Sequence, residues 1–171
     1  MDVFYKADKG EFLDKLKNTG VTEIKPVATR KTSEDIIKPL AGHDLLNDET
    51  KITAQVNSPQ RGKLSSDEAL DKSIANGFTK EEHYGAVAEI DKLYKNAILR
   101  FERDDEFGDP NVLSIRRFVA PIKIKNKPNA YAKLTLKESL DKSQTNKRIY
   151  TVELHSLEQV EKGNAALDSL V

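Results

Sequence analysis

The chain has 171 residues, of which 37% are hydrophobic and 33% charged, and its 28 Lys and Arg balance its 28 Asp and Glu. A neutral net charge gives no reason to expect nucleic-acid binding over the whole surface, so any basic patch has to be local. The absence of cysteine excludes disulfides, thiolate zinc sites and a cysteine nucleophile. No apolar run approaches the ~20 residues of a membrane span, and the first residues lack the apolar stretch of a signal peptide. We therefore expect a cytoplasmic protein that has no membrane partner, or one delivered by a secretion system that needs no such signal.

The first 50 residues predict an N-terminal arm that is partly irregular. Glu11 to Lys17 has the apolar spacing of a short helix. Residues 21–50 mix prolines and charges without clear periodicity, so we expect them to pack as a covering strap or a partner-binding arm. The expected organisation is an arm over residues 1–50, an α+β core domain over residues 51–160 and a tail over residues 161–171.

A strand and two helices are predicted at the start of the core domain. Residues 51–56 alternate in the manner of a strand. A capping box from Ser65 to Glu68 predicts a helix over about residues 66–75. A second box from Thr79 to Glu82 opens a longer helix to about Arg100, because apolar side chains recur there with helical spacing.

The rest of the core predicts an antiparallel sheet. Residues 115–125, 130–138 and 148–157 read as strands, and the short polar connections between them favour hairpins. The predicted fold class is α+β, with the N-terminal helices packed on one face of an antiparallel β-sheet of three or four strands. We expect Leu134 and Leu136 to face the long helix.

The opposite face of this sheet gathers polar side chains, which alternation predicts to project together. They are the groups that metal-independent cleavage of RNA requires: a base for the ribose 2′-hydroxyl, an acid for the leaving 5′-oxygen, and cations for the transition state. The candidate catalytic residues are Thr135, Lys137, Glu153 and His155, and the candidate substrate-binding residues are Arg117 and Lys133. The alternative is an ordinary solvated face, since an antiparallel sheet with one wet face always shows alternating polar residues.

No metal and no cofactor is expected. The three histidines lack metal-ligand spacing, and the chain has no glycine pattern of nucleotide-binding loops. His83 lies in the first turn of a predicted helix, where a positive charge is unfavourable. We interpret it as a neutral surface or packing residue.

Several short runs, in this order, resemble a large polyvalent-protein-associated domain of phages and mobile elements, over nearly two-thirds of the chain. The runs are Gly62-Lys63-Leu64-Ser65, Ala75-Asn76-Gly77-Phe78, Glu82-His83, Ile115-Arg116-Arg117-Phe118-Val119-Ala120-Pro121-Ile122, Ala132-Lys133-Leu134-Thr135-Leu136-Lys137-Glu138 and Ile149-Tyr150-Thr151-Val152-Glu153-Leu154. The layout also resembles the barnase–EndoU–colicin–RelE (BECR) ribonuclease fold. That resemblance implies N-terminal helices on a four-stranded antiparallel sheet, and by position it nominates Arg117, Thr135, Lys137, Glu153 and His155, although no complete catalytic signature matches.

These resemblances imply a cytoplasmic bacterial or prophage setting and leave two functions open. The first is a metal-independent endoribonuclease that acts as a toxin or phage effector. The second is a non-catalytic accessory or immunity module that binds a partner protein or nucleic acid. The partners that follow are RNA or a cognate toxin, antitoxin or immunity protein, and the sequence does not distinguish between them.

Overall fold

The computed structural model describes residues 3–56, 66–104, 112–141 and 147–160. Its α-helices are α1 (Lys9–Asn18), α2 (Arg30–Ile37), α3 (Asp67–Ala75), α4 (Lys80–Ala88) and α5 (Ile90–Asn96), and a 3₁₀ turn spans Lys38–Leu40. Its strands are β1 (Val3–Lys6), β2 (Thr22–Glu23), β3 (Leu45–Leu46), β4 (Thr53–Val56), β5 (Ile98–Asp104), β6 (Val112–Ile124), β7 (Lys127–Asp141) and β8 (Lys147–Gln159). Within the described residues, no helix has the length and apolar content needed to cross a bilayer.

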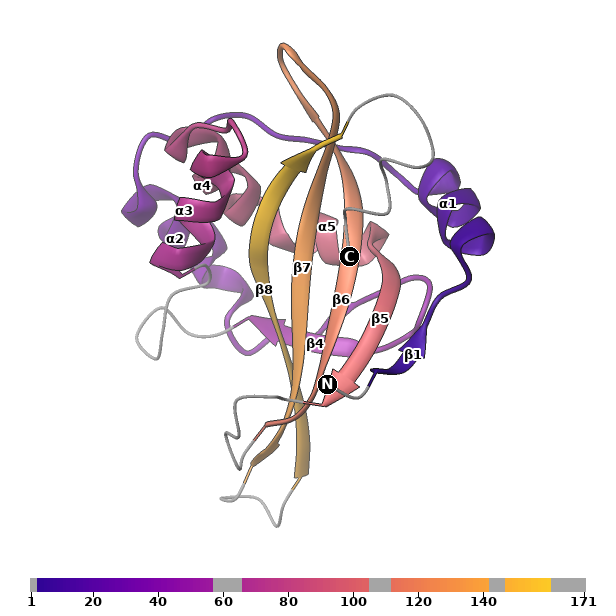
Figure 1. Ribbon diagram of the computed structural model, residues 1–171. Helices are drawn as coiled ribbons and strands as arrows, with labels where there is room; N and C mark the ends of the chain where they lie inside the picture. The colour runs from indigo at the N-terminus through magenta and orange to yellow at the C-terminus, as the bar shows by residue number, and fades with distance from the viewer. Residues whose placement is uncertain (1–2, 57–65, 105–111, 142–146, 161–171) are drawn as a thin grey trace.

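The strands form one eight-stranded sheet in the order β1-β5-β6-β7-β8-β4-β3, with β2 paired to β6. Strands β5 to β8 are an antiparallel meander, which Figure 1 shows as the long, curled centre of the molecule. β4 runs parallel to β8, and β2 runs parallel to β6. The α+β class is confirmed, but the sheet is mixed and larger than the predicted three or four antiparallel strands. Of the strands that were not predicted, β1, β2 and β3 are too short for periodicity to reveal them.

The predicted long helix from Thr79 to about Arg100 is two helices, α4 and α5, and it ends earlier than predicted, at Asn96. The predicted capping box is present, because the Thr79 and Glu82 side chains each bond the other's backbone. However, Glu89 (φ −107°, ψ 20°) separates α4 from α5, and Ala97 is extended (φ −71°, ψ 148°). Residues 98–104 form β5, where hydrogen bonds to β1 and β6 on its two sides outweigh the local helical spacing.

A β-bulge explains why β5 resembles a helix in sequence. The register of β5 against β6 shifts between Leu99 and Phe101. Ile98 pairs with Val119 and Phe101 pairs with Arg117, so two side chains three residues apart lie on the same face of the sheet. A spacing of three is also one turn of a helix, and the bulge thereby reproduces the helical signal.

The N-terminal segment contributes more regular structure than predicted. α1 confirms the short helix expected near Glu11 to Lys17. α2 was not predicted, and it begins where the Thr29 side chain accepts a hydrogen bond from the Thr32 backbone N–H. The segment before α2 crosses α4 closely, since a Cβ added to Gly85 would lie 2.1 Å from the Lys25 carbonyl oxygen.

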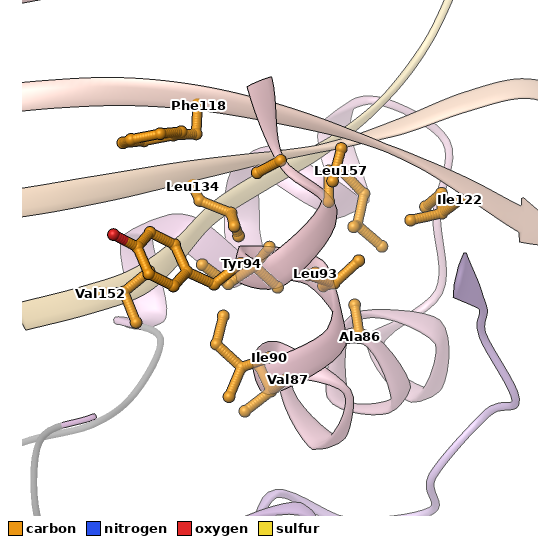
Figure 2. Close-up of a cluster of buried hydrophobic side chains, with 14 of the residues drawn as sticks. Ala86, Val87, Ile90, Leu93, Tyr94, Phe118, Ile122, Leu134, Val152 and Leu157 are labelled. Carbon is orange, nitrogen blue, oxygen red and sulfur yellow. The ribbon is translucent and has the colours of Figure 1, made fainter. Parts of the chain in front are cut away.

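The main core lies between α4 and α5 and one face of the sheet. Leu134 and Leu136 are fully buried there, which confirms the predicted inner face of β7. Figure 2 shows side chains of α4 and α5 directed at the sheet. The labelled residues are Ala86, Val87, Ile90, Leu93 and Tyr94 from the helices and Phe118, Ile122, Leu134, Val152 and Leu157 from the sheet. Each large buried side chain contributes about 1.5–3 kcal/mol to folding.

The opposite face, which we call the outer face, is covered at one end by α1. Phe12, Leu13 and Leu16 pack there in a second apolar cluster with Ile98 and Val119. The helices therefore lie on both faces of the sheet, not on one as predicted. α1 packs near β5 and β6, whereas α3 and α4 pack near β8 and α2 packs on α4 (Figure 1).

Hydrogen bonds fix α3 against β8. The Ser73 hydroxyl accepts a hydrogen bond from the Leu157 N–H at 3.0 Å and lies 2.7 Å from Nδ1 of His83. The Asn76 amide donates to the Leu157 carbonyl at 2.9 Å. His83 is fully buried, and burial, aided by the charge of Arg30, lowers its pKa to about 4. His83 is thus a neutral packing residue that helps to hold α3 in place.

Candidate functional site

A pocket of about 360 Å³ lies between the start of α3 and the outer face of the sheet. Five of the six predicted site residues line it; Lys133 does not. The lining comprises Ser66, Glu68, Ala69 and Lys72 at α3, Arg103 on β5, Ile115 and Arg117 on β6, Thr135 and Lys137 on β7, and Leu154, Glu153 and His155 on β8. No residue of the 21–50 segment is part of this lining, so the arm leaves the pocket accessible.

The strand register places three of these side chains in one row. Arg117 pairs with Thr135, and Thr135 pairs with Glu153, across β6, β7 and β8. Lys137 follows Thr135 on the same face of β7, and its Nζ lies 3.2 Å from a Glu153 carboxylate oxygen. The lysine and the carboxylate are therefore in direct contact, as catalysis by these residues requires.

Arg117 is the cation of this row, and it is buried. It is 9% exposed, and its guanidinium lies 5.7 Å from the centre of the Phe101 ring. Burial and the nearby Arg103 lower its pKa to about 10, so it remains charged at neutral pH. Its Nε atom has no hydrogen-bond partner among the described residues.

The hydroxyl of Thr135 is a second buried polar group without a hydrogen-bond partner among the described residues. Thr135 is 5% exposed, and its Oγ1 lacks a hydrogen-bond partner among the described residues. A buried polar group left unpaired costs about 1–3 kcal/mol. Arg117 and Thr135 are cross-strand neighbours, so a ligand oxygen between them would satisfy both. An anionic ligand suits the place, since the described part of the lining has four cationic side chains and two carboxylates.

His155 reaches the pocket through a second β-bulge. Lys133 pairs with Ser156 and Leu134 with Leu154, so His155 is the extra residue on β8. Its Nε2 atom lies 3.5 Å from Nζ of Lys72 on α3. Burial, followed by the charges of Arg117, Lys72, Lys133 and Arg103, lowers its pKa to about 3. The imidazole is therefore neutral at pH 7.

Lys133 lies beside the pocket. It is 6% exposed and pairs with Glu158 at 3.0 Å. Lys72 and Arg103 line the pocket, but sequence reasoning did not nominate them. Arg103 lies just beyond the predicted end of the long helix, where no strand was predicted. Lys72 carries no signal except the small buried Ala69 and Ser73 on the same side of α3.

The pocket does not assemble the ligands of a metal site. Among the described residues, no group of three or more His, Asp and Glu is placed to hold a metal ion. The pocket instead joins two unpaired hydrogen-bond donors, several cations, two carboxylates and a neutral imidazole. These groups can bind a phosphate and exchange protons beside it.

A family model described as large polyvalent protein-associated domain 3 matches residues 25–154. No curated protein and no solved structure matches the chain. The matched range includes Lys72, Arg103, Arg117 and Glu153 and ends immediately before His155.

Proposed function

This chain belongs to the family of large polyvalent protein-associated domain 3, and from that premise we propose that it is a metal-independent endoribonuclease domain of a phage or mobile element. The observation that carries the proposal is the pair of buried donors without partners, Arg117 Nε and Thr135 Oγ1, in one row with Glu153. An oxygen-rich anion that entered the pocket could give both donors a partner.

The reaction would begin with a phosphodiester held against Arg117 and Thr135. The Glu153 carboxylate would take the proton of the ribose 2′-hydroxyl, and the 2′-oxygen would attack phosphorus. The bond between phosphorus and the 5′-oxygen would break, and the 5′-oxygen would take a proton from water, because the imidazole of His155 is neutral at pH 7. The products are a 2′,3′-cyclic phosphate and a 5′-hydroxyl end.

The cations of the pocket would stabilise the charge that builds up on the phosphate oxygens. Arg117 is suited to this role because its planar guanidinium can bond two oxygens at once and its burial excludes competing water. Lys137 would hold Glu153 beside the nucleophile through their 3.2 Å contact. Lys72 and Arg103 would add positive charge from outside the three central strands.

The test is incubation with total RNA in the presence of EDTA, followed by mapping of the cleaved ends. We expect 5′-hydroxyl and cyclic-phosphate ends, and a loss of about 10²–10⁴-fold in rate for Glu153→Gln, as for removal of a general base. Glu34→Gln, on α2 and outside the pocket lining, is the matched control and should cleave as the wild type. Cleavage by Glu153→Gln at the wild-type rate would refute the assignment.

The second candidate function is a non-catalytic accessory or immunity module that binds nucleic acid or a partner protein. It is favoured by the low pKa of His155, about 3, because a neutral imidazole has no acidic proton to give at pH 7. The expected result is then RNA that is bound but intact, with binding weakened by Arg117→Met. Intact RNA with no measurable binding would leave a protein partner as the remaining form of this function.

A further inference from the structure

His155 has no role in the proposed reaction, although its imidazole lines the pocket. Burial, followed by the charge of Arg117, lowers its pKa to about 3. The charge of Arg117 contributes more to this low pKa than that of Lys72 does, although Lys72 contacts the ring. The imidazole therefore lies close to the guanidinium against which we place the phosphate.

The contact with Lys72 selects one neutral tautomer of this ring. Nζ of Lys72 lies 3.5 Å from Nε2 of His155 and 3.7 Å from a carboxylate oxygen of Glu68. A lysine ammonium has three donors and no acceptor, so Nε2 accepts from Lys72 and does not carry a proton itself. The single proton of the neutral imidazole is then on Nδ1.

Nδ1 of His155 is therefore an N–H donor, and it makes no hydrogen bond with the described residues. It belongs to the same lining as Nε of Arg117 and Oγ1 of Thr135, which also lack partners among the described residues. The oxygens of a single phosphate group could pair with all three donors. A neutral donor also suits this position, because a second cation 3.5 Å from the Lys72 ammonium would be repelled.

We propose that the Nδ1–H of His155 donates a hydrogen bond to an oxygen of the phosphodiester bound against Arg117 and Thr135, and that Lys72 fixes the tautomer that carries this donor. The ring stays neutral, so no proton is transferred. His155 is thereby a substrate-binding residue and Lys72 a positioning residue. This inference rests on the proposal that the pocket takes a phosphodiester, but it does not rest on cleavage.

A donor role is compatible with the protonation state of the ring. An opposite charge nearby raises the pKa of an imidazole by about 1–3 pH units, so a ring whose pKa is about 3 stays neutral at pH 7 with a phosphate bound. A hydrogen bond to a phosphate oxygen needs an N–H but no charge on the ring. His155 therefore has the same role whether the RNA is cleaved or only bound.

The first experiment compares two substitutions of His155 that place an amide at different ring positions. The amide of asparagine reaches the position of Nδ1, whereas the amide of glutamine reaches that of Nε2. The probe is a 2′-O-methyl oligonucleotide, which has no free 2′-hydroxyl and cannot be cleaved. We expect His155→Asn to bind it within about threefold of the wild type. His155→Gln should bind it about 10–100-fold more weakly, which is the effect of losing a hydrogen bond to a charged group.

The second experiment reads the tautomer by NMR, because the nitrogen chemical shifts of an imidazole distinguish a protonated ring nitrogen from an unprotonated one. His155→Asn assigns the signals. At pH 7 we expect a protonated Nδ1 and an unprotonated Nε2, with and without the oligonucleotide.

The length-matched variant Lys72→Met removes the donor to Nε2, so both neutral tautomers of His155 should then be populated. The Lys72 side chain is 43% exposed, so the variant is expected to fold. The control is Lys31→Met on α2, whose side chain is 84% exposed and outside the pocket lining. It should keep the tautomer and the affinity of the wild type.

The outcomes separate this inference from the ribonuclease proposal. A ring protonated on Nε2, or on both nitrogens, would overturn the inference, and so would equal affinities of the two His155 variants. Failure of the wild type to bind the oligonucleotide would overturn it as well. Intact total RNA, together with the expected difference between the two variants, would support the inference and refute the ribonuclease. Cleaved total RNA with equal affinities would do the reverse.

Discussion

Replacing Thr135 by valine should make the free protein more stable. Thr135 is 5% exposed, and its hydroxyl has no hydrogen-bond partner among the described residues. Valine keeps the branched shape and puts a methyl group where the hydroxyl was, so the packing is kept and the unpaired polar atom is lost. A buried unpaired polar group costs about 1–3 kcal/mol, so we expect the free energy of unfolding to rise by about 1–2 kcal/mol. For a chain of this size, each kcal/mol raises the melting temperature by about 2–4 °C.

The same substitution should weaken phosphate binding, because the ligand loses a donor. The assay is urea unfolding followed by circular dichroism, with and without inorganic phosphate. Phosphate should stabilise the wild type through preferential binding to the folded state, and it should stabilise Thr135→Val less. Thr22→Val is the matched control, since Thr22 is also 5% exposed with an unpaired Oγ1 but lies on β2, outside the pocket. It should raise stability similarly and leave the phosphate response unchanged.

A lower free energy of unfolding for Thr135→Val would refute the reasoning, because it would mean that the hydroxyl is satisfied in the free protein. An unchanged phosphate response would refute the assignment of Thr135 as a phosphate ligand. The two results are independent, so the stability argument and the binding argument can fail separately.

Three further substitutions test the scaffold. Gly85→Ala should destabilise strongly or prevent folding, since the new Cβ would lie 2.1 Å from the Lys25 carbonyl oxygen; soluble yield and melting temperature measure it. The pKa of His83 in the folded protein, about 4, is below its value of about 6.5 in the unfolded chain. The free energy of unfolding should therefore fall as the pH drops from about 6.5 to 4, by up to about 1.4 kcal/mol per pH unit. His83→Gln should flatten that slope in urea unfolding, whereas exposed His43→Gln should not. Asn47→Ala should cost about 1–3 kcal/mol, read from urea unfolding, because the fully buried amide donates to two carbonyls at the end of α5; a smaller loss would mean that water replaces it.

The alternation of β7 made the two faces of the sheet predictable. Leu134 and Leu136 are buried in the main core, and Thr135 and Lys137 line the pocket on the other side. A period of two is a local property of an extended strand, so it survives whatever the neighbouring strands do. The grouping of Glu153 with Lys137 followed from the same argument once the register was known.

The elements that sequence reasoning missed depend on non-local contacts. Arg103 lies on a strand whose bulge imitates a helical period, and only its pairing with β6 and β1 makes it a strand. Lys72 belongs to a correctly expected helix, but its place beside His155 depends on how α3 packs on β8. The fold comparison with BECR ribonucleases stays a prediction, because no solved structure matches the chain.

The hydrogen bonds between α3 and Leu157 also have a consequence for association between chains. β4 pairs with β8 only at Thr151 and Val152, so the rest of that side of β8 has no neighbouring strand among the described residues. Ser73 accepts from the Leu157 N–H and Asn76 donates to its carbonyl, which are the two bonds that a neighbouring strand would make. α3 thus occupies the place of a neighbouring strand at this point and blocks edge-to-edge pairing with a second sheet. The helix that walls the pocket therefore also covers this stretch of the edge of β8.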